Sequence, residues 1–344
     1  MGKSGSTGRQ IRIAVDAMGG DYAPRDIVRG AVQAAVDFGV EIILVGPKAQ
    51  IEGELKGTDL INIPVRLVEA SEVIKDGEDP IMAALRKTDS SVAVATKLVK
   101  EGEADAVVSA GATGATAVCA MRYLGTVPGI ERPMAGGAFL RLAPDTIVLD
   151  LGANVGCRPN HLVGFAAAGS IYAKIFHGID NPTIGILNVG AEKGKGNEVV
   201  KEAYSLLTNS GLNFIGNVEG MDIPKGKANV IVCDGFIGNI LLKFCEGLSE
   251  AVCHWLSQEL RGRLSQEDLK NVTSELHQLI SSSMERGGLL WGIDGVVAIA
   301  HGSSQAQQII GTIQCAKEAI ESGFVDQLRA ELERVQAGML IENK

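Results

Sequence analysis

This sequence contains few aromatic side chains and has no excess of positive charge. Phe, Trp and Tyr make up only 4% of the 344 residues, and 41 acidic against 32 basic side chains give a formal net charge of −9. A nucleic-acid-binding protein needs a basic face to displace counterions, and it commonly uses aromatic rings to stack on bases. The composition therefore argues against a nucleic-acid partner.

Motifs for a metal, a disulfide framework, a nicotinamide cofactor or a membrane span are also lacking. The six cysteines include no CxxC pair, the five histidines no HExxH spacing, and no strand is followed by GxGxxG. The longest run without Asp, Glu, Lys, Arg or His, Ala106–Met121, is shorter than the roughly 20 apolar residues of a span. We therefore expect reduced cysteines, no metal, no cofactor and a cytoplasmic protein.

Glycine, by contrast, is abundant, with 43 residues among 344, and it separates short apolar runs from helical patterns. This alternation predicts an α/β fold with a doubly wound, mostly parallel sheet, in which ligands bind at the carboxyl ends of the strands. The predicted strands are Ile11–Asp16, Val40–Val45, Ile63–Val68, Ala104–Ser109, Met134–Leu140, Ile147–Leu149, Ile184–Val189, Phe214–Val218, Val230–Cys233 and Val296–Ala300. The predicted helices are Arg25–Phe38, Ser91–Lys100, Thr113–Leu124, His161–Phe176, Glu198–Asn209, Ile237–Leu256, Leu269–Met284 and Gln305–Ser322.

The chain shows no linker or internal repeat, so we predict a single α/β domain over residues 11–344 after a disordered tail over 1–10. Between residues 235 and 286 two helical patterns follow one another with no strand between them. They predict a helical hairpin that projects from the sheet or pairs with another subunit.

Six polar, glycine-bearing turns follow predicted strands. Each turn alone can also be explained without a ligand, as a capped or closely packed turn, and Asp21 is well placed to cap the first helix. Lysines in such a loop are usually just solvated. If the sheet is parallel, however, the turns converge on one rim, which favours a site for a polar, anionic ligand. The turns are Ala17–Pro24, Ser109–Ala115, Asp150–Gly156, Asn188–Asn197, Cys233–Asn239 and His301–Ser304.

The motifs in these turns resemble one known family along most of the chain. DAMGGDYAP, SAGATGA, LDLGAN, LNVGAEKGKGNE, GNVEG, DGFIGN with LLK shortly after, and HGSS occur in this order. They resemble the bacterial acyl-ACP:phosphate acyltransferases of phospholipid synthesis, the PlsX family, from Ile11 to about Ser322. The resemblance implies transfer of a fatty acyl group from acyl carrier protein to inorganic phosphate, forming acyl phosphate.

The same resemblance implies a fold similar to isocitrate/isopropylmalate dehydrogenases and phosphotransacetylases. It also implies a homodimer that touches the membrane peripherally, with a possible hand-off to a glycerol-3-phosphate acyltransferase. Two positions depart from the family pattern: Ala112 stands where Asn is general, and Gly156 stands near a position that is often Asp.

The chemistry agrees with these residues, because phosphate is already an anionic nucleophile and a thiolate with a pKa of about 8.5 leaves without a strong acid. Orientation and oxyanion stabilisation remain as tasks for amides and cations. We predict Lys195 and Asn239 as catalytic residues, while Asp16 and Asp234 would orient loops. The predicted substrate- and phosphate-binding residues are Asp16, Gly19, Gly20, Asp21, Ser109, Gly111, Thr113, Gly114, Asn154, Asn188, Lys193, Asn197, Asp234, Gly235, His301 and Ser303.

The tip of the predicted hairpin carries both apolar and basic residues. It is either packed inside the hairpin or dimer, or exposed as a surface for the membrane or the acidic carrier protein. Two other functions stay open: a metal-assisted NAD-dependent dehydrogenase on the same fold, and a non-catalytic docking scaffold. The residues of the predicted tip surface are Trp255, Leu260, Arg261, Arg263, Leu264 and Lys270.

Overall fold

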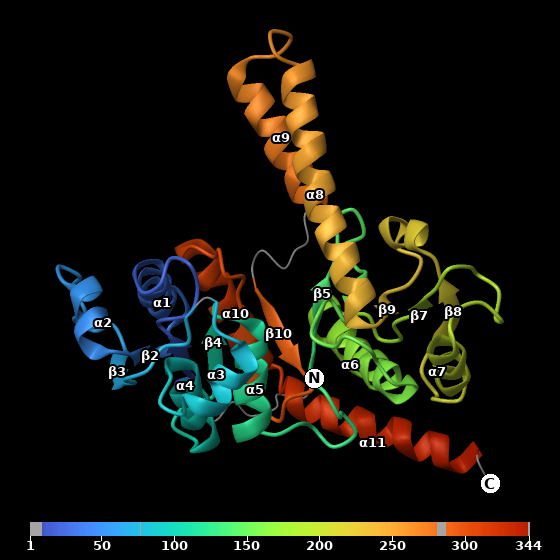
Figure 1. Cartoon of the computed structure of the whole chain (residues 1–344), viewed down its shortest axis with the longest axis horizontal. Coiled ribbons are helices and arrows are strands. Elements are labelled where there is room, and N and C mark those ends of the chain that lie inside the picture. The colour runs from blue at the N-terminus through green and yellow to red at the C-terminus, as the bar shows by residue number, and fades with distance from the viewer. Residues whose placement is uncertain (1–8, 76, 281–286, 343–344) are drawn as a thin grey trace. The chain divides into compact units, whose positions relative to one another are not determined.

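The computed structural model describes residues 9–75, 77–280 and 287–342, and the chain divides into two compact units (Figure 1). Unit 1 comprises Met1–Val127 and Glu285–Gln327, and unit 2 comprises Pro128–Met284 and Leu328–Lys344. The sequence predicts one domain over 11–344, whereas the structure divides these residues between two compact units. Strands and helices alternate on both sides of Val127, so the sequence pattern carries no mark of this division.

The start of the chain is held earlier than the sequence predicts. Residues 1–8 of the predicted tail lie outside the described residues. Gln10 already donates a side-chain hydrogen bond of 3.0 Å to the carbonyl oxygen of Gly39, and Arg9 forms an ion pair of 3.5 Å with Asp105. The described chain is therefore anchored from Arg9 onward.

The sheet of unit 1 has the strand order β3-β2-β1-β4-β11-β10. Neighbouring strands are parallel except for β10 and β11, which are antiparallel. The strands are mostly branched aliphatic residues buried on both faces, as parallel strands covered by helices require. Their bounds are β1 (Arg12–Asp16), β2 (Glu41–Gly46), β3 (Val65–Glu69), β4 (Ala106–Ser109), β10 (Gly288–Trp291) and β11 (Val296–Ile299).

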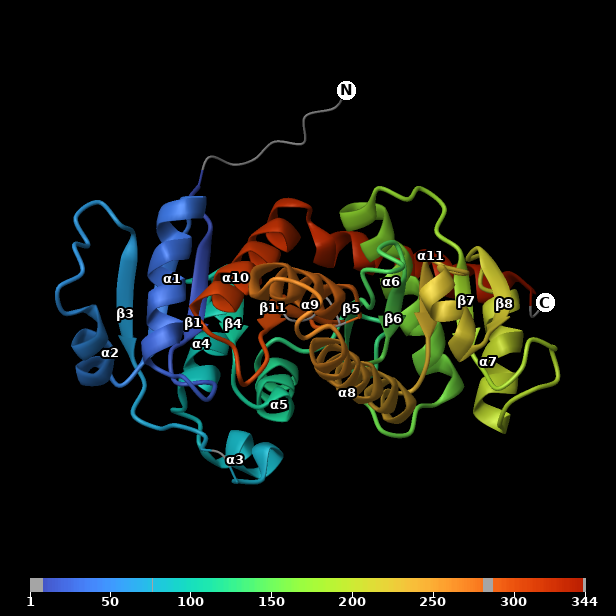
Figure 2. The ribbon, with the colours of Figure 1, turned by 90° about the horizontal axis from the view of Figure 1, so that it is seen from above.

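Helices cover both faces of this sheet. The pair α1 and α10 packs on one face, and α4 with α5 packs on the other (Figures 1 and 2). Between the sheet and α4, residues such as Ala14, Ile43 and Val107 form a buried apolar cluster. The helices of unit 1 are α1 (Arg25–Phe38), α2 (Lys48–Leu55), α3 (Pro80–Arg86), α4 (Ser91–Lys100), α5 (Thr113–Tyr123) and α10 (Ala306–Glu321).

The sheet of unit 2 has the order β5-β6-β9-β7-β8, in which only β5 and β6 are antiparallel. Helix α6 packs on β6 and β9, and α7 packs on β8. The strands are β5 (Met134–Ala138), β6 (Ile147–Leu149), β7 (Ile184–Leu187), β8 (Phe214–Val218) and β9 (Val230–Val232). The helices are α6 (Pro159–His177), α7 (Glu198–Thr208), the 3₁₀ helix η1 (Gly220–Lys225) and α11 (Phe324–Glu342), whose first residues belong to unit 1.

The predicted helical hairpin is confirmed as α8 (Gly235–Glu259) and α9 (Gln266–Ile280), which extend away from the strands of unit 2 (Figure 1). The predicted residues beyond Ile280 lie outside the described residues. The seam between the two helices is partly polar: Ser249 Oγ lies 2.9 Å from His277 Nδ1, and Cys253 Sγ lies 3.4 Å from the carbonyl oxygen of Thr273. No residue of α9 is buried in the described structure, so apolar packing within the hairpin is shallow.

The predicted fold class is confirmed, since parallel strands alternate with helices in both units. The elements that the sequence did not predict are α2, α3, η1, β10 and α11. No helix in the described residues combines the length and the apolar character needed to cross a bilayer.

Candidate active site

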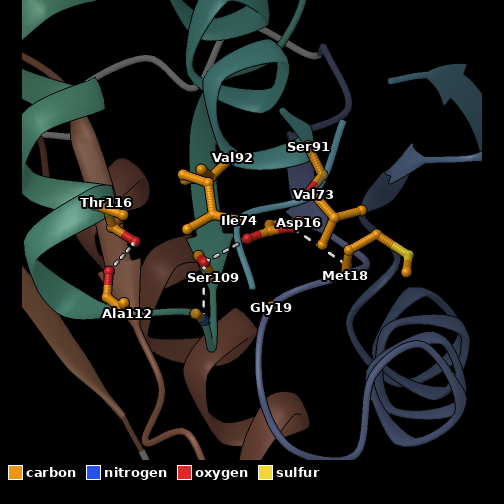
Figure 3. A pocket seen from close by; sticks show the side chains of 12 residues that line it. Asp16, Met18, Gly19, Val73, Ile74, Ser91, Val92, Ser109, Ala112 and Thr116 are labelled. Atoms are coloured by element: carbon orange, nitrogen blue, oxygen red, sulfur yellow. Dashed lines mark hydrogen bonds between the residues drawn. The ribbon is translucent and has the colours of Figure 1, made fainter. Parts of the chain in front are cut away.

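Three of the predicted turns meet in unit 1, at the carboxyl ends of β1, β4 and β11. Asp16 is the last residue of β1 and Ser109 the last of β4, and the Ser109 hydroxyl donates a hydrogen bond of 2.7 Å to Asp16 Oδ2 (Figure 3). The same Ser109 oxygen accepts a hydrogen bond of 3.1 Å from the backbone N–H of Gly111. The third turn joins them because Asp21 N–H donates to the carbonyl oxygen of Gly302 at 2.8 Å.

Glycine is required where the first two turns touch. A Cβ on Gly19 would lie 2.5 Å from the backbone nitrogen of Gly111, a distance that no side chain tolerates. Gly20 has a φ of +102°, which favours glycine. The predicted glycines Gly19, Gly20 and Gly111 therefore serve close backbone approach in the cradle formed by residues 16–20 and 109–115.

A small cavity of about 20 Å³, partly open to solvent, lies at this cradle (Figure 3). Helix α5 begins beside it, and its N-cap residue Ala112 has a methyl side chain that cannot accept a hydrogen bond. The first backbone N–H groups of α5 are thus left for water or a ligand. Sequence reasoning missed much of the apolar wall. The cavity is lined by Asp16, Met18, Gly19, Val73, Ile74, Ser91, Val92, Ser109, Gly111, Ala112, Ala115 and Thr116.

Asp16 is an ionisable group at the base of this cavity, with only 3% of its surface exposed. Burial raises its pKa above the usual 3.8, because a carboxylate loses hydration there. Hydrogen bonds from the hydroxyls of Ser91 and Ser109 and from the backbone of Met18 act in the opposite direction. The hydrogen bond from Ser109 places Asp16 where its carboxylate can orient that hydroxyl, and this role stays a prediction.

Asp21 does not cap the first helix, contrary to expectation. The N-cap residue of α1 is Pro24, and no side chain caps this terminus. The backbone N–H of Asp21 instead donates to the carbonyl oxygen of Gly302, and the Asp21 side chain is exposed. His301 and Ser303 in the same loop are exposed and hydrogen bond to each other at 2.8 Å. Thr113 is exposed at the start of α5.

The other three turns lie in unit 2, after the parallel strands β6, β9 and β7. Asp150 organises the first of them. It begins the predicted turn but is not among the predicted site residues. Its carboxylate accepts hydrogen bonds from the backbone N–H groups of Ala135, Gly152, Ala153 and Asn154 and from the Asn154 side chain, at 2.7–3.2 Å. Burial raises the pKa of Asp150, and these donors oppose that shift.

The N-terminus of α8 docks directly on the turn that Asp150 organises. Gly235 N–H donates to the carbonyl oxygen of Asn154 at 2.8 Å. A Cβ on Gly238 would come within 1.8 Å of the carbonyl oxygen of Asp150, so only glycine fits. Asn239 follows in the chain and is exposed, and a Cβ on Gly152 would lie 3.3 Å from its Oδ1. The helix that carries Asn239 is therefore fixed to this turn at Gly235 and Gly238.

The third turn of unit 2, residues 188–197, is the lysine loop. Asn188 Nδ2 donates to the carbonyl oxygen of Lys195 at 3.0 Å, and Lys195 N–H donates to the carbonyl oxygen of Glu192 at 3.0 Å. The Lys193 ammonium lies 5.7 Å from the centre of the Tyr204 ring, a cation–π contact. Lys195 is exposed, and its ammonium makes no hydrogen bond or ion pair within the part of the chain described here.

Three further predicted binding side chains in unit 2 also make hydrogen bonds within the protein. Asn154 is buried and donates to Pro133 and Asp150. Asn197 caps α7, and Asp234 caps α8 by accepting from Ile237 N–H at 2.9 Å. These contacts support loop-holding roles, in the way that the sequence suggested for Asp234.

The second departure from the family pattern has a backbone reason. Gly156 has a φ of +78°, in the left-handed region that glycine adopts without steric cost. No group of three or more His, Cys, Asp or Glu side chains that could hold a metal ion occurs among the described residues.

The fold defines a structural class. The chain is similar to a solved phosphotransacetylase from Streptococcus pyogenes, with a TM-score of 0.63 and 20% identity over 91% of this chain and 95% of that one. A phosphotransacetylase from Staphylococcus aureus gives 0.58 and 18% over 90% and 94%. The protein therefore has the α/β fold of the phosphotransacetylases.

Sequence comparison is more specific. The family model described as "Fatty acid synthesis protein" matches residues 11–327. Curated proteins named phosphate acyltransferase are 44% identical in Desulfitobacterium hafniense strain Y51, over 95% of this chain and 99% of the relative, and 42% identical in Trichodesmium erythraeum, over 93% and 96%. The chain belongs to this phosphate acyltransferase family of fatty acid synthesis proteins, and fold and relatives together support an acyltransferase.

Proposed function

We propose that this protein transfers a fatty acyl group from acyl carrier protein to inorganic phosphate and releases acyl phosphate for phospholipid synthesis. The observation that carries the proposal is the lysine loop. In a member of the phosphate acyltransferase family, the backbone of Lys195 is fixed by hydrogen bonds on both sides while its ammonium stays exposed and unpaired among the described residues. An uncompensated cation on a fixed backbone is suited to stabilise an anionic nucleophile or a developing oxyanion.

The proposed reaction needs no activated side-chain nucleophile. A phosphate oxygen attacks the thioester carbonyl, a C–O bond forms, and the C–S bond breaks with its electron pair on sulfur. The thiolate then takes up a proton from solvent. Lys195 would stabilise the negative charge on phosphate or on the carbonyl oxygen, and Asn239 would donate an amide hydrogen to the same charge.

We keep Lys195, the lysine predicted from the sequence, for this task, and a contact of Lys193 supports that assignment. The Lys193 ammonium lies over the Tyr204 ring, so moving it to a substrate would break a cation–π contact. Lys195 has no such contact to break in the described residues.

The cradle in unit 1 suits an anionic group of a substrate. The uncapped start of α5 and the exposed Thr113 hydroxyl offer hydrogen-bond donors at the positive end of a helix dipole. The buried carboxylate of Asp16 would repel an anion at contact distance. We therefore assign Asp16 to hold Ser109 rather than to bind phosphate.

Part of the hairpin surface supports a second copy of the chain as a partner. Along α8 the side chains of Ile240, Phe244, Leu248 and Trp255 recur at intervals of four or seven residues and are 43–64% exposed. A stripe of this kind is costly in water and is typical of a surface that another chain covers. We assign this stripe to the proposed homodimer.

The tip of the hairpin supports peripheral membrane contact. Leu264 is 39% exposed between the exposed side chains of Arg261, Arg263 and Lys270, and Leu260 is half-buried. Arg263 pairs with Glu259 at 3.2 Å, so its charge is partly compensated. Apolar residues flanked by cations suit an anionic bilayer interface, from which acyl phosphate could pass to a glycerol-3-phosphate acyltransferase.

The test is an assay with purified protein, acyl-loaded acyl carrier protein and phosphate. Acyl phosphate is trapped with hydroxylamine, and free carrier thiol is counted separately. We expect the two products to appear in equal amounts and only when phosphate is present. Thiol release without phosphate would indicate a thioesterase, and no release at all would contradict the proposed function.

A further inference from the structure

Asn217 lies outside the predicted site, in the GNVEG segment of β8, yet it contacts the lysine loop. Its side chain is 5% exposed, and Nδ2 donates a hydrogen bond of 2.7 Å to the carbonyl oxygen of Glu192. Glu192 and Asn217 are 25 residues apart in sequence. The contact therefore ties the exposed loop to the sheet of unit 2.

The Glu192 carbonyl connects this buried amide to the backbone of Lys195. The same oxygen that accepts from Asn217 also accepts from Lys195 N–H at 3.0 Å. On its other side, the Lys195 carbonyl accepts from Asn188, which directly follows β7. Since Leu187 of β7 pairs with Val218 of β8, both attachments of Lys195 lead to the same end of two adjacent strands.

The rest of the loop offers little restraint of its own. Residues 191–195 are exposed, and glycines flank Lys195 at positions 194 and 196. Such a segment has high backbone entropy, so hydrogen bonds to the sheet determine where its lysine lies. Removing one of the two attachments would let the ammonium of Lys195 occupy many positions.

The side-chain oxygen of Asn217 indicates that this position needs an amide for its donor and not for its acceptor. Its Oδ1 is buried and has no hydrogen-bond partner in the described residues. An unpaired buried acceptor lowers the stability of the folded state, a cost that an apolar side chain in a strand would avoid. The Nδ2 donor to Glu192 is the feature that an apolar residue could not supply.

We propose that Asn217 is a positioning residue that fixes Lys195 for acyl transfer. The inference rests on the proposed function, because it assumes that Lys195 acts on the substrates. It predicts that Asn217 matters for turnover only as long as Lys195 is present.

The test is a double-mutant cycle on the intact protein. Asn217→Leu keeps similar size, removes the orphaned acceptor and should fold with an unchanged or higher Tm. It should lower kcat by about 10- to 100-fold, the loss typical of a misplaced catalytic group, while the KM for acyl-carrier protein stays the same. In a Lys195→Ala background, adding Asn217→Leu should change kcat by less than roughly two-fold.

A matched control is Asn229, another partly buried amide of unit 2, whose Oδ1 accepts from Thr183 N–H and from the Thr183 hydroxyl at 2.9 Å. Asn229→Ala should lower stability and change kcat by the same small factor with or without Lys195. Equal losses from Asn217→Leu in both backgrounds, or no loss in either, would overturn the positioning role. Wild-type turnover by Lys195→Ala would instead overturn the lysine assignment in the proposed function, and with it the role of Asn217.

Discussion

Gly238 lies against Asp150 so closely that a Cβ at this glycine would come within 1.8 Å of the Asp150 carbonyl oxygen. This contact joins the start of α8 to the turn after β6, and it places Asn239 beside that turn. This contact requires glycine at position 238, whereas Gly247 in the same helix has open space around it, and the difference can be tested directly.

Gly238→Ala should destabilise the protein by about 1–3 kcal/mol or more, because the methyl group must displace backbone. Gly247 is the matched control within α8, since a Cβ there meets nothing within 4 Å. Gly247→Ala should stabilise the helix by about 1 kcal/mol. Urea unfolding of both variants measures the difference, and equal effects would contradict the close packing of α8.

Ala112→Asn should raise the free energy of unfolding by about 0.5–2 kcal/mol, because asparagine can cap the free N–H groups of α5. Ala112→Val, which adds bulk without an acceptor, should not do so. Denaturant unfolding checks the pair. A fall in stability with Asn would show that the first turn of α5 is not available for capping.

Asp16→Asn should change the pH dependence of stability. Burial raises the pKa of Asp16 in the folded state above 3.8, so its favourable contribution is present below pH 3.8 and is lost as pH rises through the folded pKa. The stability of the variant relative to the wild type should therefore increase as pH rises from about 4 through that raised pKa. Urea unfolding across pH 4–8 measures it, and a constant difference would exclude a raised pKa.

The double variant Leu260→Glu/Leu264→Glu should release the protein from anionic phospholipid vesicles without unfolding it. Turnover of a small soluble acyl thioester should survive. Ile61→Glu is the control, because Ile61 is 77% exposed in unit 1, away from the hairpin in the sequence. Unfolding, or dissociation of a dimer, in the double variant would show that these leucines are core residues.

Phosphate-dependent acyl transfer should persist in excess EDTA, since the nucleophile is anionic, the thiolate leaves readily and Lys195 supplies positive charge. The assay is the hydroxylamine trap before and after chelation. Loss of turnover that Mg²⁺ restores would require a metal in the mechanism.

Local sequence pattern was enough to predict most of the fold. The bounds of α1 and α4 agree with the predicted helices, because each has one apolar face and polar flanks. Strand β10 was missed because GLLW is too short to show a period. Helix α3 was missed because its Ile81, Met82 and Leu85 are exposed, which is the reverse of the usual pattern.

The site was predictable only where a residue's neighbours are close in sequence. The turns after strands were found, and the structure brings them together as two groups of three, one in each unit. Asp150 was not selected because one of its donors comes from Ala135, and Asn217 was not selected because its partner is 25 residues away. Such roles depend on strand order, which the local pattern does not contain.

The most direct test of the central claim compares two lysines of one loop. In the acyl phosphate assay, Lys195→Ala should fold normally and form product about 10²- to 10³-fold more slowly, as expected for loss of one preorganised charge. Lys193→Ala, whose ammonium lies over Tyr204, should keep near-normal turnover. Near-normal turnover by Lys195→Ala, with the loss found in Lys193→Ala or in neither, would contradict the account.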